Sequence, residues 1–315
     1  MPGGAIYPMN DFQYGLEKLM QLDRAQLAAL AAILRHGSFD RAAAELGITQ
    51  SAVSQRLRAL EERIGTPLIR RGPPARATEA GAQLARHADE IALLEAQTLQ
   101  RMNLAPGAAR VRLAVNADSL ATWMPAALAR AQDAMPGTSF EVEVDDQDHS
   151  ARWLREGQVS GAITSEGASL LGCDALPLGA LRYRATASPG YMARHLPEGA
   201  TAEALARAPM LSFNDKDGLQ GLWLQTHFGP GLRPPTHRLP STEGFVLAAE
   251  AGLGWGLNPE VLMAPGLASG RLVELIPDTP HDTPLFWQVS RLMAPGLAPL
   301  TRAIRDAARS FLIAG

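Results

Sequence analysis

The sequence predicts an α/β fold with an all-α winged helix-turn-helix at its N-terminal end. Residues 38–65 have the apolar spacing of two helices joined at a glycine. Residues 78–103 form one long amphipathic segment. Beyond residue 110, short apolar runs alternate with helical patterns, as strands and their covering helices do in an α/β sheet.

This pattern divides the chain into four parts. The first 21 residues, which contain several Pro and Gly, are expected to be a flexible extension. Residues 22–80 form the head, residues 81–109 a linker helix and a hinge, and residues 110–315 two α/β lobes. A strand-rich segment at 176–187 should cross between the lobes, so that they enclose a cleft and resemble a periplasmic binding protein.

The two helices of the helix-turn-helix begin and end at recognisable residues. Ser38 can cap the first helix through its hydroxyl, and Gly47 tolerates the positive φ that ends a helix. Thr49 or Gln50 begins the second helix. The inner side of that helix repeats apolar residues at helical spacing, namely Ala52, Val53, Leu57, Leu60 and Ile64.

The other face of the second helix is polar. Its hydroxyl, amide and guanidinium side chains suit phosphates and base edges in a DNA major groove; they are Gln50, Ser51, Ser54, Gln55, Arg56 and Arg58, with Ser38 counted at the same surface. Spacing alone fits a solvated helical hairpin about equally well. The basic segment that follows favours a β-wing on DNA, with Arg70, Arg71 and Arg76 at its tip and flanks.

The charge of the chain is unevenly distributed. The net charge of −3 comes from 29 basic and 32 acidic residues. Residues 22–86 hold ten Arg and six acids (10 − 6 = +4), and the remainder holds 19 basic and 26 acidic residues (19 − 26 = −7). A basic head on an acidic body indicates that only the head binds nucleic acid.

A long helix is predicted after the wing, with Thr78 as its N-cap. Its apolar seam consists of Leu84, Ala88, Ile91, Leu94, Ala96, Leu99 and Met102. A lone helix of this length would be marginal in water, so the seam needs a partner. The partner is either the body of the same chain or the same helix of a second chain. The second choice gives a homodimer with two heads for an inverted-repeat DNA site.

Candidate ligand-binding residues follow the first predicted strand of the lobes. Ligands of open α/β sheets bind beyond the carboxyl ends of strands, at helix N-termini. Within the segment that starts at Asn116, the hydroxyls of Ser119 and Thr122 suit a carboxylate. Asp118 could pair with an ammonium. Asp118 or Ser119 could equally be a simple helix cap.

Other strand ends carry further candidates. Asp145 and Asp146 could receive a guanidinium or an ε-ammonium, or could belong to a solvated acidic loop. Equivalent positions are occupied by Thr164, Asn214, Asp215, Thr242 and Glu243. Trp123 and Phe245 are expected to be core residues rather than stacking partners of a ligand.

Catalysis and metal binding find little support. The sequence has no glycine-rich phosphate loop and no nucleophile elbow, and its seven His do not fall at metal-ligand spacing. We therefore expect a non-enzyme with no catalytic residue, metal or cofactor. The single Cys excludes an internal disulfide and fits a cytoplasmic protein, and no apolar run approaches the ~20 residues of a membrane span.

Two runs of sequence resemble a known family. The run ITQSAVSQRLRALEERIGTPLIRR, followed by ATEAG at 77–81, resembles the DNA-binding domain of LysR-type transcriptional regulators. The run AVNADSLATW at 114–123 resembles the effector domain of the ArgP/LysG group of that family. The resemblance extends from about Leu22 to the end of the chain.

The resemblance implies a cytoplasmic regulator that senses lysine or arginine and controls genes of amino-acid export or metabolism. It also implies binding to double-stranded DNA as a homodimer or a tetramer, with RNA polymerase as a possible further partner. A rival interpretation is a ligand-independent architectural DNA-binding protein or inhibitor of replication initiation, a role also linked to this group. An enzyme on the same two-lobed fold is a more remote alternative.

Overall fold

The computed structural model describes residues 21–70, 72–102, 104, 109–144, 153–154 and 158–314. The predicted extension therefore lies almost wholly outside the described residues, as do Arg71, Asp145 and Asp146. The chain forms two units, one up to Ala109 and one from Arg110 onward, and each is described by itself. In the described part of the chain, no helix has the length and the apolar character needed to cross a membrane.

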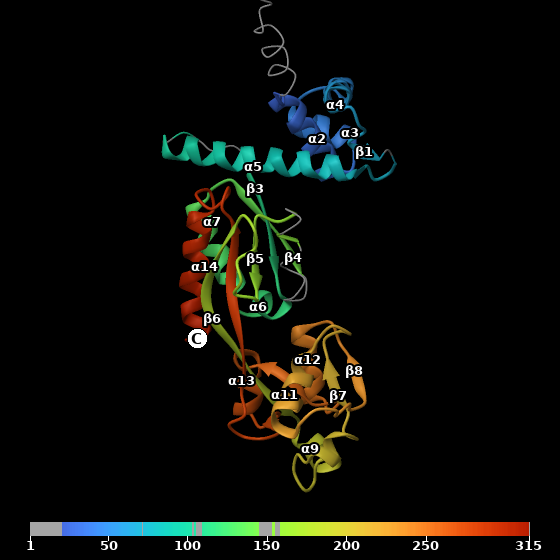
Figure 1. Ribbon diagram of the computed structural model, residues 1–315, viewed down its shortest axis with the longest axis vertical. Helices are drawn as coiled ribbons and strands as arrows, with labels where there is room; N and C mark the ends of the chain where they lie inside the picture. Colours follow the sequence, from blue (N-terminus) through green and yellow to red (C-terminus); the bar gives the residue numbers. More distant parts are fainter. Residues whose placement is uncertain are drawn as a thin grey trace, which may run out of the picture. The chain divides into compact units, whose positions relative to one another are not determined.

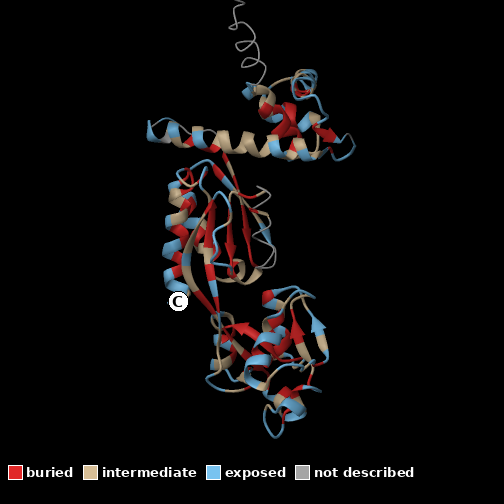
Figure 2. Cartoon of the chain, viewed as in Figure 1, coloured by how far each residue is buried: buried red, intermediate tan, exposed pale blue. Residues whose placement is uncertain are grey.

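The first unit contains a helical head, a wing and a long helix (Figure 1). Its elements are α2 (Arg24–His36), α3 (Phe39–Leu46), α4 (Gln50–Ile64), the hairpin β1 (Ile69–Arg70) and β2 (Arg76–Ala77), and α5 (Glu79–Arg101). The buried core of the head lies between α2, α3 and α4 and includes Leu30, Ile33, Val53, Leu57 and Leu60 (Figure 2). This is the arrangement of a winged helix-turn-helix.

The helix termini follow the local signals in the sequence. The Ser38 hydroxyl accepts a hydrogen bond from the Arg41 N–H at 3.4 Å, and Gly47 ends α3 at φ 64°. Thr49, rather than Gln50, is the N-cap of α4, because its hydroxyl accepts the Ala52 N–H at 3.2 Å.

Ile64 does not belong to the buried side of α4, contrary to the prediction. It is 38% exposed, because it lies in the last turn of the helix, directly before the left-handed Gly65. The chain leaves the helix there, so the core has no neighbour that could cover this side chain.

The N-terminal half of α5 packs on the head of its own chain. Leu84, Ala88 and Ile91 lie against the buried core of the head. Each of these three residues uses part of its surface on its own head and is only partly buried. Their place in a seam with a second chain stays a prediction. The helix leaves apolar surface exposed near its other end, where Leu94 is 38% and Met102 is 63% exposed.

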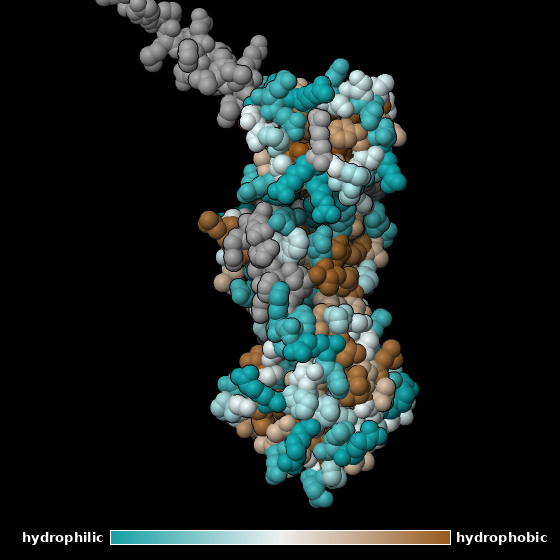
Figure 3. All heavy atoms as spheres, turned by 90° about the vertical axis from the view of Figure 1, so that its right-hand side faces the viewer, coloured by the Kyte–Doolittle hydropathy of each residue, from teal (hydrophilic) through white to brown (hydrophobic). Residues whose placement is uncertain are grey.

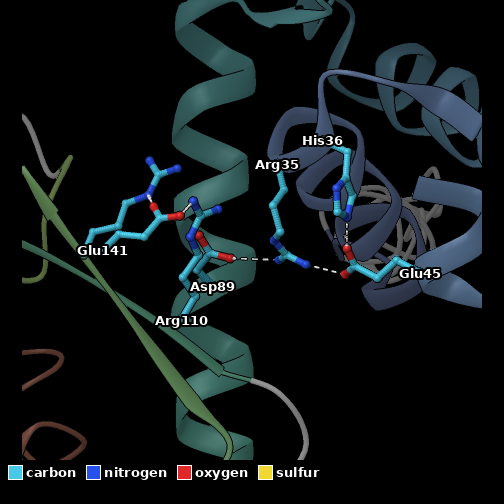
Figure 4. A network of polar contacts seen from close by, with 7 residues as sticks. Arg35, His36, Glu45, Asp89, Arg110 and Glu141 are labelled. Carbon is cyan, nitrogen blue, oxygen red and sulfur yellow. Dashed lines mark hydrogen bonds and ion pairs between the residues drawn. The ribbon is translucent and has the colours of Figure 1, made fainter. Parts of the chain in front are cut away.

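Ion pairs strengthen the contact between α5 and the head. Arg35 of α2 bonds to Glu45 of α3 and lies 3.7 Å from Asp89 of α5 (Figure 4). Glu45 also contacts His36 Nε2 at 2.5 Å. Burial alone would raise the pKa of the Glu45 carboxyl, but the hydrogen bonds and charges of His36 and Arg35 hold it below its usual value.

The second unit consists of two lobes (Figure 1). The first lobe contains β3 (Ala109–Val115), α6 (Ala117–Thr122), α7 (Met124–Ala134), β4 (Thr138–Val144), β5 (Gly161–Thr164) and α14 (Ala298–Phe311). The second contains α9 (Pro189–His195), α10 (Ala202–Leu205), β7 (Met210–Ser212), α11 (Leu219–Phe228), β8 (Thr236–Arg238), α12 (Thr242–Glu250), β9 (Gly256–Pro259), α13 (Glu260–Ala268) and β10 (Val273–Glu274). The long strands β6 (Cys173–Ala187) and β11 (His281–Ser290) run between the lobes.

One mixed sheet connects the two lobes. Its strand order is β10-β6-β11-β5-β3-β4, with β9 also paired to β6. β3 and β5 are parallel, whereas β11 is antiparallel to both β5 and β6. β3 and β5 are largely buried, whereas the edge strand β4 has one buried residue (Figure 2). Glu141 of β4 pairs with Arg110 and Arg112 of β3 (Figure 4). The predicted crossing strand at 176–187 corresponds to β6.

The strands are irregular where they pass from one lobe to the other. Gly179 has φ 123°, and the pairing register shifts between Leu285 and Phe286. The C-terminal segment lies at the same place, because Ala180 and Ile313 exchange two backbone hydrogen bonds at 3.0 Å. The C-terminus is therefore attached to the boundary between the lobes.

Two helices, rather than one, lie between β3 and β4. The segment divides into α6 and α7, because Pro125 has no N–H to continue the ladder and instead lies in the first turn of α7. On the face in Figure 3, the lower lobe shows teal and white atoms with separate groups of brown ones, as expected for a water-exposed surface.

Candidate functional site

A cavity of about 160 Å³ lies between the two lobes. The first lobe contributes Asn116, Ala117, Asp118 and Val144 to its wall, and the second contributes Phe213, Asn214, Asp217, Leu219, Gln220, Phe245 and Leu257. This volume suits a small metabolite rather than a peptide or a dinucleotide. The described lining contains two carboxylates and no Lys, Arg or His side chain.

Asp118 connects the lobes at this cavity. The Tyr183 hydroxyl of β6 donates to Asp118 Oδ2 at 2.6 Å, and the Thr242 hydroxyl of α12 donates to Asp118 Oδ1 at 2.7 Å. Both carboxylate oxygens are therefore oriented by hydroxyl groups of the crossing strand and the second lobe. Hydrogen bonds to a charged acceptor of this kind are stronger than those between neutral groups.

Asp217 is the second carboxylate of the cavity. Its Oδ2 accepts the Phe213 N–H at 2.8 Å, and its Oδ1 accepts the Leu219 N–H at 3.1 Å. The amide of Gln220, oriented with its nitrogen toward Asp217, donates to both carboxylate oxygens at 3.1 Å. Neutral amide donors hold this carboxylate in place without cancelling its charge.

Asn116 places a buried donor at the cavity wall. It caps α6, because its Oδ1 accepts the Ser119 N–H at 3.3 Å, and this bond fixes the orientation of the side-chain amide. Its Nδ2 has no hydrogen-bond partner among the described residues, although the residue is only 3% exposed. A buried donor without a partner is costly, so a ligand acceptor at this position would be favoured.

The candidate DNA-binding surface lies on α4 and the wing. Gln50, Ser54 and Arg58 are one turn apart along α4 and line a groove with the wing residues Gly72 and Pro73. A groove between the recognition helix and the wing suits a phosphate backbone that passes along it.

The other predicted α4 residues lie on different sides of the helix. Ser51 and Gln55 are exposed next to the groove-lining residues. Arg56 lies about 200° around the helix from Ser54, at 100° per residue, so these two side chains cannot face the same groove. Ser38 is occupied as the N-cap of α3.

The wing carries two arginines directly opposite each other. Arg70 of β1 and Arg76 of β2 are cross-strand neighbours, and both are exposed. Like charges at such positions repel and destabilise the hairpin. A phosphate between them would remove this repulsion, which fits a wing that contacts DNA.

Comparison with known proteins identifies the family of the chain. Residues 25–82 match the bacterial regulatory helix-turn-helix protein, lysR family, and residues 105–309 match the LysR substrate binding domain. The chain belongs to the LysR family. It is thus a DNA-binding transcriptional regulator, and its relatives are regulators rather than enzymes, in agreement with the prediction from the sequence.

Individual relatives resemble this LysR-family chain over most of its length. The HTH-type transcriptional regulator LysG of Mycobacterium tuberculosis is 47% identical over 290 residues, which cover 91% of this chain and 94% of the relative. The lysine export transcriptional regulatory protein LysG of Corynebacterium glutamicum is 39% identical over 284 residues, covering 90% and 97%. The solved full-length LysG of Corynebacterium glutamicum with bound effector Arg has a TM-score of 0.65 at 38% identity, covering 93% and 100%.

Several residues predicted to bind the effector do not line the cavity of this LysR-family regulator. The Thr122 hydroxyl donates to the Asp118 carbonyl within α6 at 2.6 Å, and Thr164 is buried in a network with Gln288. Asp215 points to the surface, where it pairs with Arg238. Glu243 is exposed as well. All four acidic or hydroxyl positions were plausible by sequence, but their side chains do not line the cavity.

Four of the predicted residues line the cavity or bond to its lining, and a fifth, Ser119, does not reach it. Asn116 and Asn214 line the cavity together with Asp118, and Thr242 bonds to Asp118. Ser119 is fully buried, and its hydroxyl has no partner among the described residues.

Asp217, Gln220 and Tyr183 were not among the predicted residues. Asp217 lies two residues beyond Asp215, so the strand end was identified, but the acid that lines the cavity is the later one. Tyr183 lies within a strand and has no local signal. Phe245, predicted to be core, is 5% exposed and also forms part of the cavity wall. Within the described ranges, no group of three or more His, Cys, Asp or Glu side chains could hold a metal ion.

Proposed function

We propose that this LysR-family regulator binds arginine or lysine in the cavity between its lobes, and that the bound amino acid controls transcription of amino-acid export or metabolism genes. The observation that carries the proposal is the cavity wall itself, which has the carboxylates of Asp118 and Asp217 and no described cationic side chain. Two partly buried carboxylates in one wall favour a positively charged ligand, because a cationic donor hydrogen-bonds to a carboxylate more strongly than a neutral donor does.

The relatives support the same choice of ligand. The LysG structure from Corynebacterium glutamicum was solved with bound effector Arg, and the curated LysG of that organism is named a lysine export regulatory protein. Arginine and lysine share an α-amino acid group and a cationic side chain, so one cavity can accept both. We also propose a cytoplasmic location, because the DNA operator of a bacterial regulator lies in the cytoplasm.

On the DNA side, we propose that Gln50, Ser54, Gln55 and Arg58 contact bases or nearby phosphates in the major groove. Arg70 and Arg76 of the wing would then contact the DNA backbone, and we propose the same role for Arg71, which follows Arg70 in the sequence. A homodimer formed through the exposed C-terminal half of α5 would present two heads to an inverted repeat, and two dimers could assemble into a tetramer. Contact with RNA polymerase remains a further element of the proposal.

A thermal-shift screen of the amino acids tests the ligand. A ligand at about 100 times its dissociation constant adds ~2.7 kcal/mol to the free energy of unfolding, which is readily measured. Arginine and lysine should raise the unfolding temperature, and leucine should not. In calorimetric titration, Asp118→Asn should lose most of the affinity for both ligands while it retains operator binding.

Two results would contradict this proposal. Equal affinity of the parent protein for leucine and arginine would show that the carboxylates do not select the ligand. Operator binding that no amino acid alters would instead favour the ligand-independent, architectural role.

Operator binding is tested with two variants of the head. Gln55→Ala should lower the ratio of operator affinity to random-DNA affinity, at ~1–3 kcal/mol for a good base contact. Arg76→Ala should weaken binding to all sequences about equally and lower the salt slope by roughly one unit, because it removes one phosphate contact. An unchanged affinity ratio for Gln55→Ala would place base recognition on another face of α4.

A further inference from the structure

We infer that the amino acid binds in one orientation, with its α-amino acid group on the first lobe and its side-chain cation at Asp217 on the second. Asp217 is then the residue that selects a cationic side chain. The inference rests on the proposed function, because it assigns groups of the same ligand to particular residues of the same cavity.

The first lobe offers one donor and one acceptor side by side. The Asn116 amide has a buried Nδ2 with no partner among the described residues, and its orientation is fixed by the Ser119 bond. Asp118 lies two residues further on, at the start of the same helix. A carboxylate that accepts from Nδ2 and an ammonium that donates to Asp118 are the two groups that every α-amino acid carries on one carbon.

The Asp118 carboxylate is held in position for this role. Tyr183 and Thr242 donate to its two oxygens at 2.6 and 2.7 Å, from the crossing strand and from α12. Both oxygens therefore have a defined direction toward a ligand ammonium group. The α-ammonium group is the same in every amino acid, so its contact with Asp118 cannot distinguish arginine from a neutral analogue.

The second lobe offers a carboxylate to the other end of the ligand. Asp217 is fixed by the backbone N–H groups of Phe213 and Leu219 and by the Gln220 amide, all of them uncharged donors. The neighbouring acid Asp215 is different, since it is paired with Arg238 at the surface. Of these two acids, Asp217 alone lines the cavity.

Apolar side chains cover the space between the two ends. Val144, Phe213, Leu219, Phe245 and Leu257 belong to the described wall of the cavity. Apolar surface suits the methylene stem of arginine or lysine, whose charged ends then meet carboxylates. A ligand bound in this way contacts both lobes, so its binding energy depends on how far the lobes are closed.

Arginine and citrulline separate this inference from its alternatives. The two amino acids have the same length and shape, but citrulline has a neutral urea group in place of the guanidinium. Isothermal titration of the full-length parent should give at least a tenfold preference for arginine. Asp217→Asn should bring the arginine-to-citrulline affinity ratio close to one. Asp215→Asn is the matched control, because it removes the same charge from an exposed position two residues away, and it should leave the ratio unchanged.

A second variant tests the orientation without altering the Asp217 loop. Asp118→Asn should weaken arginine and citrulline by similar factors and keep their ratio, because the α-ammonium is common to both. Two results would overturn the inference: an arginine-to-citrulline affinity ratio near one in Asp118→Asn, or a parent-like ratio in a folded Asp217→Asn. If Asp217→Asn does not fold, the affinity ratio measured for Asp118→Asn tests the inference.

The proposed function fails separately from the inference. A parent protein that binds neither arginine nor lysine would refute the proposed function. A parent that binds arginine tightly, with a ratio that Asp217→Asn leaves unchanged, would refute only the assignment of Asp217.

Discussion

Replacing Gly81 by Ala should move the long helix α5 away from the base of the wing. Gly81 lies in the first turn of α5, and a Cβ at this position would be 1.9 Å from the carbonyl oxygen of Leu68. Real Cβ atoms do not approach closer than 3.0 Å, so the backbone must shift by about 1.1 Å (3.0 − 1.9). The Leu68 oxygen cannot turn away freely, because it accepts the Thr78 N–H at 3.0 Å.

The magnitude follows from three opposing contributions. Ala is favoured over Gly inside a helix by ~1 kcal/mol. Overpacking at a closely packed contact costs about 1–3 kcal/mol, and loss of the bond between Thr78 and Leu68 costs about 0.5–1.5 kcal/mol. The net expectation is a destabilisation of roughly 0.5–3.5 kcal/mol. Operator affinity should fall as well, since the wing is displaced relative to α4.

Gly221→Ala is the matched control for this prediction. Gly221 also lies inside a helix, α11, but no atom lies within 4 Å of the position that its Cβ would occupy. The same substitution should therefore stabilise the second lobe by ~0.5–1 kcal/mol. Scanning calorimetry is the suitable assay, because the two units can unfold separately. A Gly81→Ala protein with the unfolding temperature and operator affinity of the parent would refute the reasoning.

Three further predictions concern the cavity, the ion pair between Arg182 of β6 and Asp282 of β11, and assembly. Thr242→Val should lower arginine affinity severalfold in calorimetric titration, because Asp118 loses one of its two oriented hydroxyl donors; unchanged affinity would contradict this role. The hydrogen bond from Arg182 holds the pKa of Asp282 below its usual value. This interaction therefore stabilises the folded state above about pH 4, and the stabilisation is lost as the pH falls through the lower pKa of the folded state. Arg182→Gln should hence be less stable than the parent in urea unfolding at pH 7, with a difference that shrinks below about pH 4. Met102→Asp should give monomers in sedimentation velocity, whereas a parent-like oligomer would exclude this end of α5 from the dimer interface.

The sequence by itself determined the features that depend on near neighbours along the chain. Ser38 and Thr49 each cap a helix by accepting an N–H three residues ahead, and Gly47 ends α3 with a positive φ. These contacts close within one turn, so the residue types and their spacing are sufficient to predict them. The order of strands and helices in the lobes follows from hydrophobic periodicity for the same reason.

Only the tertiary structure decided which residues meet across long stretches of chain. Tyr183 and Thr242 reach Asp118 from 65 and 124 residues away, and no periodicity in the sequence encodes these contacts. The sequence also could not predict which of Asp215 and Asp217 lines the cavity. Both follow the same strand, and only the direction of each side chain distinguishes them.

The seam of α5 illustrates the same limit. Its apolar spacing correctly required a partner, but spacing is the same whether the partner is the head of one chain or a helix of another. Ile91 packs on the head, while Met102 is left exposed. Gly81 and Gly221 both lie in helices. Replacement by Ala is expected to destabilise the protein at Gly81 and to stabilise it at Gly221, because only Gly81 lies against the Leu68 carbonyl oxygen. Local hydrogen bonding and periodicity thus determined the elements of this protein, whereas the packing of distant segments decided its exposed surface, its cavity and the residues that line the cavity.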